Sequence, residues 1–220
     1  MQAICIIKLL AGINPDCHQT VLRHQLGMPT PKILAFAGST RTASYNKHLV
    51  KIAAEGARAA NVVVEVIDLR DFPLPLYDGD LEEKEGLPAN ARKLKALMLE
   101  ASGFLISAPE YNSSITAVLK NAIDWASRAE SESEKPLACF RGKAAALLSA
   151  SPGGFGGMRG LVHLRSILGN IGMHVLPDQI SIATAHEAFD SAGQLKQEGK
   201  RDQVLALGKS LAEFVIRHQG

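Results

Sequence analysis

Residues 38–47, GSTRTASYNK, gather small hydroxyl side chains and cations at the point where an apolar run ends. The run KILAFA precedes them, and a helical pattern follows from residue 44. Hydroxyls, a guanidinium and the free amides of a helix N-terminus together form a typical anion site. The segment has neither the GxxxxGK[ST] nor the GxGxxG pattern, which favours a terminal phosphomonoester over a pyrophosphate or triphosphate. The alternative is that Ser44 only caps the helix and that Arg41 is solvated.

Two further segments combine a strand end with residues suited to a flat ligand. In APEYN (residues 108–112), Pro109 blocks helix formation, so the polar residues after it project at the strand end before Ser113 or Ser114 caps the next helix. In SASPGGFGGMRG (residues 149–160), glycines expose backbone amides and allow close approach by a ring.

Each of these features also has a plainer interpretation. Tyr111 can be a packed rim aromatic, Trp125 a core residue of its helix, and the glycines a tight turn. Their joint presence at one end of one predicted sheet favours a binding site.

The rest of the sequence offers no nucleophile or metal centre. There is no GxSxG elbow and no HExxH motif, and His163 and His174 are interpreted as packing or surface residues. The three cysteines form no CxxC pair, which argues against a disulfide framework or zinc site and fits a reducing, cytoplasmic setting. The net charge of +2 without charged blocks gives no indication of nucleic-acid or membrane binding.

Apolar runs alternate with amphipathic stretches from residue 32 onward. Strands are predicted over residues 32–38, 61–69, 103–109, 142–151 and 173–177. Helices are predicted over residues 44–60, 89–102, 113–127, 156–172 and 201–219, and residues 70–88 are predicted to be loop.

This alternation predicts an α/β fold, a five-stranded parallel sheet with helices on both faces. Ligands of such sheets bind beyond the carboxyl ends of the strands, where the three segments lie. Residues 1–30 are expected to be a disordered or loosely docked extension with Met28 as an alternative start, and residues 31–220 to form one domain.

The segments GSTRTASYNK, PEYNSSITAVLKNAIDW and SPGGFGGMRG resemble the signatures of the NADPH-dependent FMN reductases, flavodoxin-like proteins that include quinone, chromate and azo-dye reductases. The resemblance covers roughly residues 31–217. It implies a flavodoxin-like doubly wound fold, bound FMN and NADPH or NADH as electron donor.

The resemblance also implies which residues bind the cofactor. The matching positions for the FMN phosphate are Ser39, Arg41, Ser44 and Asn46. Those for the isoalloxazine ring are Pro109, Glu110, Tyr111, Asn112, Ser151, Gly153, Gly154 and Gly156. Tyr111 and Asn112 are the nearest candidates for a catalytic role, although the chemistry belongs to the flavin. This chain departs from the family at Ser113, where glycine is usual, and at Thr116 and Ala117, where Pro-Gly is usual.

The implied activity is hydride transfer from NAD(P)H to FMN and then transfer of two electrons to a quinone, azo compound or similar small acceptor. A homodimer or homotetramer is expected by analogy with the family. The alternatives are a flavodoxin-type electron carrier and a non-catalytic flavin-binding redox sensor. Electron carriers of that type are typically strongly acidic, and this chain is not.

Overall fold

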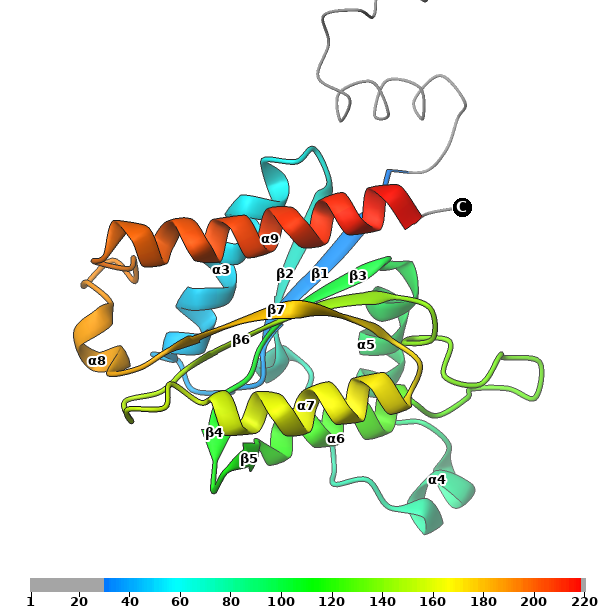
Figure 1. Cartoon of the computed structure of the whole chain (residues 1–220). Coiled ribbons are helices and arrows are strands. Elements are labelled where there is room, and N and C mark those ends of the chain that lie inside the picture. Colours follow the sequence, from blue (N-terminus) through cyan, green and yellow to red (C-terminus); the bar gives the residue numbers. More distant parts are fainter. Residues whose placement is uncertain (1–29, 219–220) are drawn as a thin grey trace, which may run out of the picture.

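The centre of the molecule is a five-stranded parallel sheet, seen in the computed structural model of residues 30–218 (Figure 1). The strands lie in the order β2-β1-β3-β6-β7, with all pairings parallel. Their bounds are β1 Lys32–Ala37, β2 Val63–Asp68, β3 Gly103–Ser107, β6 Ala144–Ala150 and β7 His174–Ile182. The predicted α/β fold is therefore confirmed, while residues 1–29 of the expected extension lie outside the described residues.

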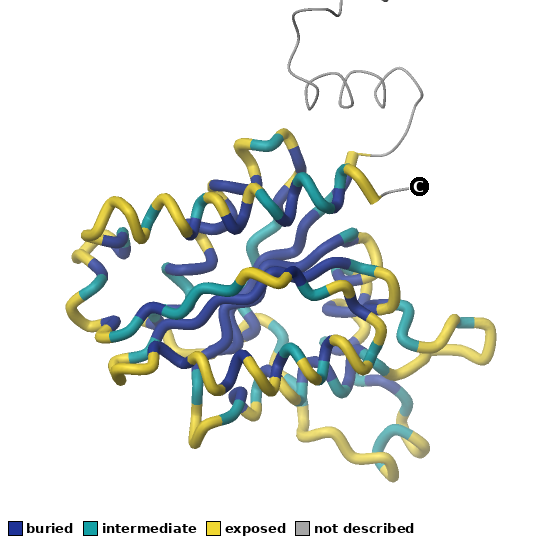
Figure 2. Tube along the Cα trace, in the orientation of Figure 1, coloured by how far each residue is buried: buried dark blue, intermediate teal, exposed yellow. Residues whose placement is uncertain are grey.

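Helices cover both faces of this sheet. The first face is covered by α3 (Tyr45–Arg58) and α9 (Glu198–His218), and the second by α5 (Ala89–Glu100), α6 (Ala117–Ala126) and α7 (Met158–Asn170). Strands β1, β3 and β6 are buried along almost their whole length, as their unbroken apolar runs predict (Figure 2). The core is thus two apolar layers, one on each side of the sheet.

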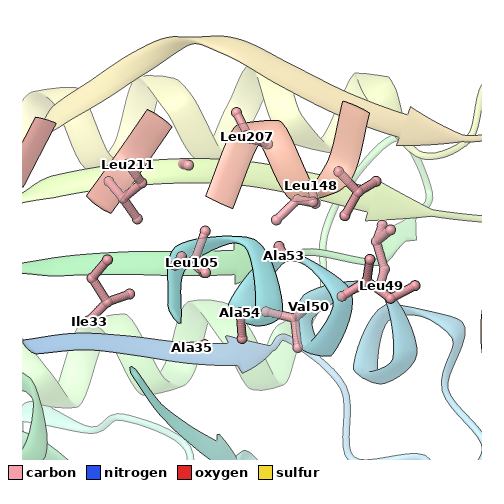
Figure 3. Packing of buried hydrophobic residues seen from close by; sticks show 14 of the residues in the cluster. Ile33, Ala35, Leu49, Val50, Ala53, Ala54, Leu105, Leu148, Leu207 and Leu211 are labelled. Atoms are coloured by element: carbon pink, nitrogen blue, oxygen red, sulfur yellow. The ribbon is translucent and has the colours of Figure 1, made fainter. Parts of the chain in front are cut away.

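The first layer shows how closely the helices pack (Figure 3). Leucines of α3 and α9 meet apolar side chains of β1, β3 and β6 there. Two glycines permit the two helices to approach each other: a Cβ on Gly56 would collide with the carbonyl of Leu205, and one on Gly208 with the carbonyl of Ala53. Trp125 is completely buried, as predicted, in a small separate apolar cluster with Leu87 and Ala91.

The segment predicted to be loop, residues 70–88, contains two short helices. A 3-10 turn, η1 (Leu69–Asp71), follows β2 directly, and α4 (Gly79–Glu85) projects from the body (Figure 1). Each begins at an aspartate whose carboxylate accepts an amide hydrogen: Asp68 from Arg70, and Asp78 from Asp80. The prediction of a loop over residues 70–88 was wrong because the prolines and acidic residues favoured a loop and the two aspartates were not recognised as helix caps. A short helix, α8 (Ala185–Ala188), was also not predicted.

Strand β7 is longer than the predicted residues 173–177 and continues through Pro177 to Ile182. Proline is tolerated because β7 is an edge strand, and the pairing with β6 shifts register between Ala145 and Leu147. The guanidinium of Arg165 on α7 donates to the carbonyls of three residues around this irregularity, Val175, Leu176 and Pro177. Sequence patterns do not reveal such hydrogen bonds between a helix side chain and the backbone of the neighbouring strand.

Candidate functional site

The first loop, residues 38–44, joins β1 to α3 at the carboxyl edge of the sheet. Ser44 occupies the N-cap position of α3, but its side chain makes no capping hydrogen bond. The expectation that its hydroxyl caps the helix is therefore wrong. Because Ser44 and Ser39 are both buried at the base of the loop, two hydroxyls lie beside the N-terminus of a helix of 14 residues.

Arg41 lies at the exposed tip of this loop. Its backbone amide donates to Ser39 Oγ over 3.3 Å. Its guanidinium makes no hydrogen bond or ion pair with any residue from 30 to 218. The side chain is therefore available to a ligand.

Asn46, in the first turn of α3, makes structural contacts that the sequence did not predict. Its side chain is buried, donates to the Ala150 carbonyl over 2.8 Å, and accepts from the Ala150 amide and from Ser107 Oγ. These bonds hold the start of α3 against the ends of β3 and β6. The side-chain amide is thus engaged within the protein, while its backbone amide belongs to the first turn of the helix, where amides have no partner within the helix.

The second loop is a hairpin rather than the start of a helix. Strands β4 (Glu110–Tyr111) and β5 (Ser114–Ile115) pair antiparallel, and both turn residues have positive φ, 50° at Asn112 and 65° at Ser113. The predicted helix start at residue 113, with Ser113 or Ser114 as cap, is wrong.

Helix α6 begins at Ala117, and Thr116 is its cap. Thr116 Oγ1 accepts from the Leu119 amide and donates to the Gly38 carbonyl over 2.6 Å, so this side chain also ties the second loop to the first. A proline cannot make either contact.

The Glu110 carboxylate joins the second loop to the N-terminus of α7. It accepts from Arg159 Nε over 2.7 Å and from the backbone amides of Arg159 and Gly160 over 3.0 and 3.2 Å. Burial raises the pKa of Glu110, but these hydrogen bonds outweigh it and hold the pKa below its usual value. The expected contact between Glu110 and a flavin ring is therefore left to its backbone and aliphatic part.

The third loop, residues 151–157, contains the glycines. The Gly153 amide donates to Ser151 Oγ over 3.2 Å, and the Gly156 amide donates to the Gly153 carbonyl over 3.1 Å. Gly157 has φ 89°, and a Cβ there would collide with Ser149 Oγ, so the loop requires glycine at this position. A Cβ on Gly154 would meet nothing within 4 Å, so the surface there is open.

The three loops meet at one small hollow of about 60 Å³. Its lining comprises Ser39, Arg41, Ser44, Tyr45, Asn46, Pro109, Glu110, Tyr111, Ala150, Ser151 and Pro152. Eight of these are residues predicted from the sequence. Asn112, Gly153, Gly154 and Gly156 are not part of the lining, although they belong to the same loops.

The sequence analysis missed three residues that line the hollow, Tyr45, Ala150 and Pro152. Tyr45 stacks on Phe189, with ring centroids 5.7 Å apart and planes 20° from parallel. Phe189 directly follows α8 and is far from Tyr45 in the sequence, so no local pattern indicated this contact.

The size of the hollow limits how a coenzyme is bound. It is much smaller than the roughly 300–1,000 Å³ of pockets that enclose a whole ligand. It suits the phosphate end of FMN, beside the unused Arg41 guanidinium and the two buried hydroxyls. Outside the hollow, the surface is bounded by Tyr111, which is 53% exposed, and by the open glycine loop.

Metal chemistry has no support in residues 30–218. They contain no group of three or more His, Cys, Asp or Glu residues placed to hold a metal ion. His163 is exposed, and its Nδ1 lies 2.9 Å from Ser114 Oγ, while the His174 ring packs near Phe214.

Comparison with known proteins agrees with this geometry. The family model described as NADPH-dependent FMN reductase matches residues 31–187. A probable NADPH:quinone oxidoreductase of Oryza sativa is 35% identical over 202 residues, 88% of this chain and 95% of that protein. An NAD(P)H-dependent FMN reductase of Pseudomonas aeruginosa is 36% identical over 190 residues, 86% of this chain and 97% of that protein.

Solved structures show the same relationship. A flavoenzyme NAD(P)H:(acceptor) oxidoreductase from Paracoccus denitrificans superposes with a TM-score of 0.71 at 26% identity, covering 86% of this chain and 99% of that one. An archaeal flavodoxin, at 15% identity and a TM-score of 0.56 over 84% and 98% of the chains, shares the fold. On its sequence, its fold and its three converging loops, the chain belongs to the NADPH-dependent FMN reductase family.

Proposed function

We propose that this protein is an FMN-dependent oxidoreductase that takes two electrons from NADPH or NADH and gives them to a quinone, an azo compound or a similar small acceptor. The observation that carries the proposal is the hollow where the three loops meet, with an uncommitted guanidinium and two buried hydroxyls at a helix N-terminus. Membership of the NADPH-dependent FMN reductase family supports the same function. FMN, when bound, supplies the two-electron chemistry itself.

The residues of the first loop would hold the phosphate. Arg41 supplies a charge-assisted contact, Ser39 and Ser44 supply hydroxyl donors, and the first-turn amides of α3 supply the positive end of the helix dipole. Asn46 positions this group by fastening α3 to the strand ends, through its bonds to Ala150 and Ser107.

The second and third loops would form the two walls beside the ring. Glu110 keeps these walls together by binding the N-terminus of α7. Within residues 151–157, the Ser151, Gly153 and Gly156 amides are already paired, so the amides of Gly154, Phe155 and Gly157 are the candidate donors to negative charge developing on the ring.

We further propose that a homodimer or homotetramer covers the open side of the site. Four large apolar side chains are exposed near it: Tyr111, Phe155, Met158 and Val162. Exposed apolar groups of this size around a site are typical of subunit or ligand contacts. A cytoplasmic location completes the proposal, and among residues 30–218 no helix is long and apolar enough to cross a bilayer.

The absorbance spectrum of the purified protein tests the proposal. We expect bound FMN, its bleaching by NADPH or NADH under anaerobic conditions, and rapid recovery when a quinone is added. A protein that binds FMN but oxidises neither nucleotide would instead be an electron carrier, and full flavin loading with slow turnover of every acceptor would indicate a redox sensor. A colourless protein that takes up no added FMN would overturn the assignment altogether.

A further inference from the structure

The tip of the first loop has little packing of its own. Residues 40–43 are all exposed, and the loop supports itself through one bond, from the Arg41 amide to Ser39 Oγ. Behind the tip lies a cavity of about 340 Å³ whose lining includes Thr40 and Arg70. The loop tip thus has few contacts of its own that would hold it in one conformation.

Arg70 makes the contacts that fix this tip. Its Nε donates to the Thr40 carbonyl over 2.8 Å, its Nη2 donates to the same oxygen, and its Nη1 donates to Thr42 Oγ1 over 2.8 Å. Among residues 30–218, these are the only hydrogen bonds that reach residues 40–43 from outside the first loop.

Arg70 is itself held in position by the end of β2. Its backbone amide donates to Asp68 Oδ1 over 3.0 Å, and Asp68 Oδ2 pairs with Lys47 Nζ of α3 over 2.5 Å. Strand β2 pairs with β1 as far as Ala37 and Asp68, so Arg70 emerges beside the first loop. The guanidinium thus connects the loop tip to two rigid elements.

We propose that Arg70 is a positioning residue of the phosphate site: it fixes the backbone of residues 40–43 so that Arg41 and the loop hydroxyls are arranged before the phosphate of the flavin arrives. This inference rests on the proposed function. It adds to the phosphate site a residue, Arg70, that does not line the hollow. Arranging a loop in advance removes the entropy cost of ordering it on binding. A lysine replaces the arginine only in part, because an ammonium group lacks the planar fork that reaches both acceptors.

The test compares FMN with riboflavin, which has the same ring and no phosphate. Dissociation constants for both flavins are measured by fluorescence quenching on the flavin-stripped full-length chain, for wild type, Arg70→Gln and Arg70→Lys. We expect FMN binding to weaken by about tenfold in Arg70→Gln and by a smaller factor in Arg70→Lys. Riboflavin binding should stay within about twofold of wild type, because the ring walls do not involve Arg70.

The matched control is Arg58→Gln. Arg58 is also exposed and also donates to one backbone carbonyl, that of Val64, at the start of β2 and away from the site. The Arg58→Gln variant should therefore bind FMN and riboflavin with the affinities of the wild type. Thr42→Val removes one of the two acceptors and should weaken FMN binding in the same direction as Arg70→Gln.

Three outcomes would overturn the inference. Unchanged FMN affinity in Arg70→Gln would show that the loop is arranged without Arg70. Equal losses for FMN and riboflavin would indicate general damage rather than a phosphate-specific effect. If the wild-type protein binds neither flavin, the proposed function fails together with this inference, a result distinct from a failure confined to the variants.

Discussion

Arg41 is the residue that we propose to contact the phosphate most directly, because its guanidinium has no partner among residues 30–218. We predict that Arg41→Ala weakens FMN binding by roughly ten- to hundredfold, since losing a charge-assisted contact costs about 1.5–3 kcal/mol. The measurement is FMN titration followed by flavin fluorescence. Arg217→Ala, at the distant end of α9, should bind FMN like the wild type, and equal affinity in Arg41→Ala would refute the assignment.

Ser113 adopts a backbone conformation that suits glycine. At φ 65° it is the second of two left-handed residues in the β4–β5 turn, where glycine is strongly preferred. We predict that Ser113→Gly raises the free energy of unfolding by about 0.5–1 kcal/mol, because relief of left-handed strain exceeds the added freedom of the unfolded chain. Urea unfolding measures the change. Ser113→Ala keeps the strain, so a gain of equal size in that variant would contradict the explanation.

At the scale of elements, Lys95 fixes the long connection between α6 and β6. Its side chain is completely buried on α5, and its Nζ pairs with Glu134 Oε1 over 2.7 Å and donates to the Arg128 carbonyl. Glu134 in turn accepts from the Glu130 amide over 2.8 Å. One buried cation thereby orders a segment that has little regular structure.

We predict that Glu134→Gln lowers the free energy of unfolding by about 3 kcal/mol, because it leaves the buried ammonium group without its counter-charge. Chemical denaturation measures the loss. Adding Lys95→Met should recover most of it, and Glu85→Gln, in an exposed pair with Lys84, should change stability very little. A double variant no more stable than the single one would show that the charge is not the cause.

The three loops could be predicted as a site because parallel strands bring their carboxyl ends to one edge of a sheet. The partners of single side chains could not be predicted. Asn46 is bonded to Ala150 in a strand 104 positions away, and Glu110 to the start of α7, 49 positions away. No local pattern records such pairs, because they depend on how loops of different strands are placed against each other.

At the scale of the whole molecule, stability should depend on a set of carboxylates. Burial raises the pKa of Asp68, Glu82, Glu110 and Glu134, but hydrogen bonds and cationic partners outweigh it and hold each pKa below its usual value. A carboxyl with a lower pKa in the folded state binds fewer protons there than in the unfolded chain. Its stabilisation is therefore complete above the unfolded-state pKa and is lost as pH falls through the folded-state value.

We predict that the free energy of unfolding decreases as the pH falls below about 5 and continues to decrease toward about 3. Denaturation at a series of pH values measures the dependence. Glu110→Gln should flatten the curve in this range, while Glu83→Gln, on the exposed surface of α4, should leave its slope unchanged. A wild-type curve that is flat below about pH 5 would contradict the role given to these carboxylates.

The α/β fold, the order of most helices and strands, and the three loops at the sheet edge could all be inferred from the amino-acid sequence, because they follow from apolar periodicity and from glycine and proline. The folded molecule was needed to find that Asn46 bonds Ala150, that Thr116 caps α6 and that Arg70 bonds the first loop. The difference lies in the distance along the sequence. Periodicity is a property of neighbouring residues, whereas a polar side chain bonds to whichever distant group the packing of the elements brings within about 3 Å.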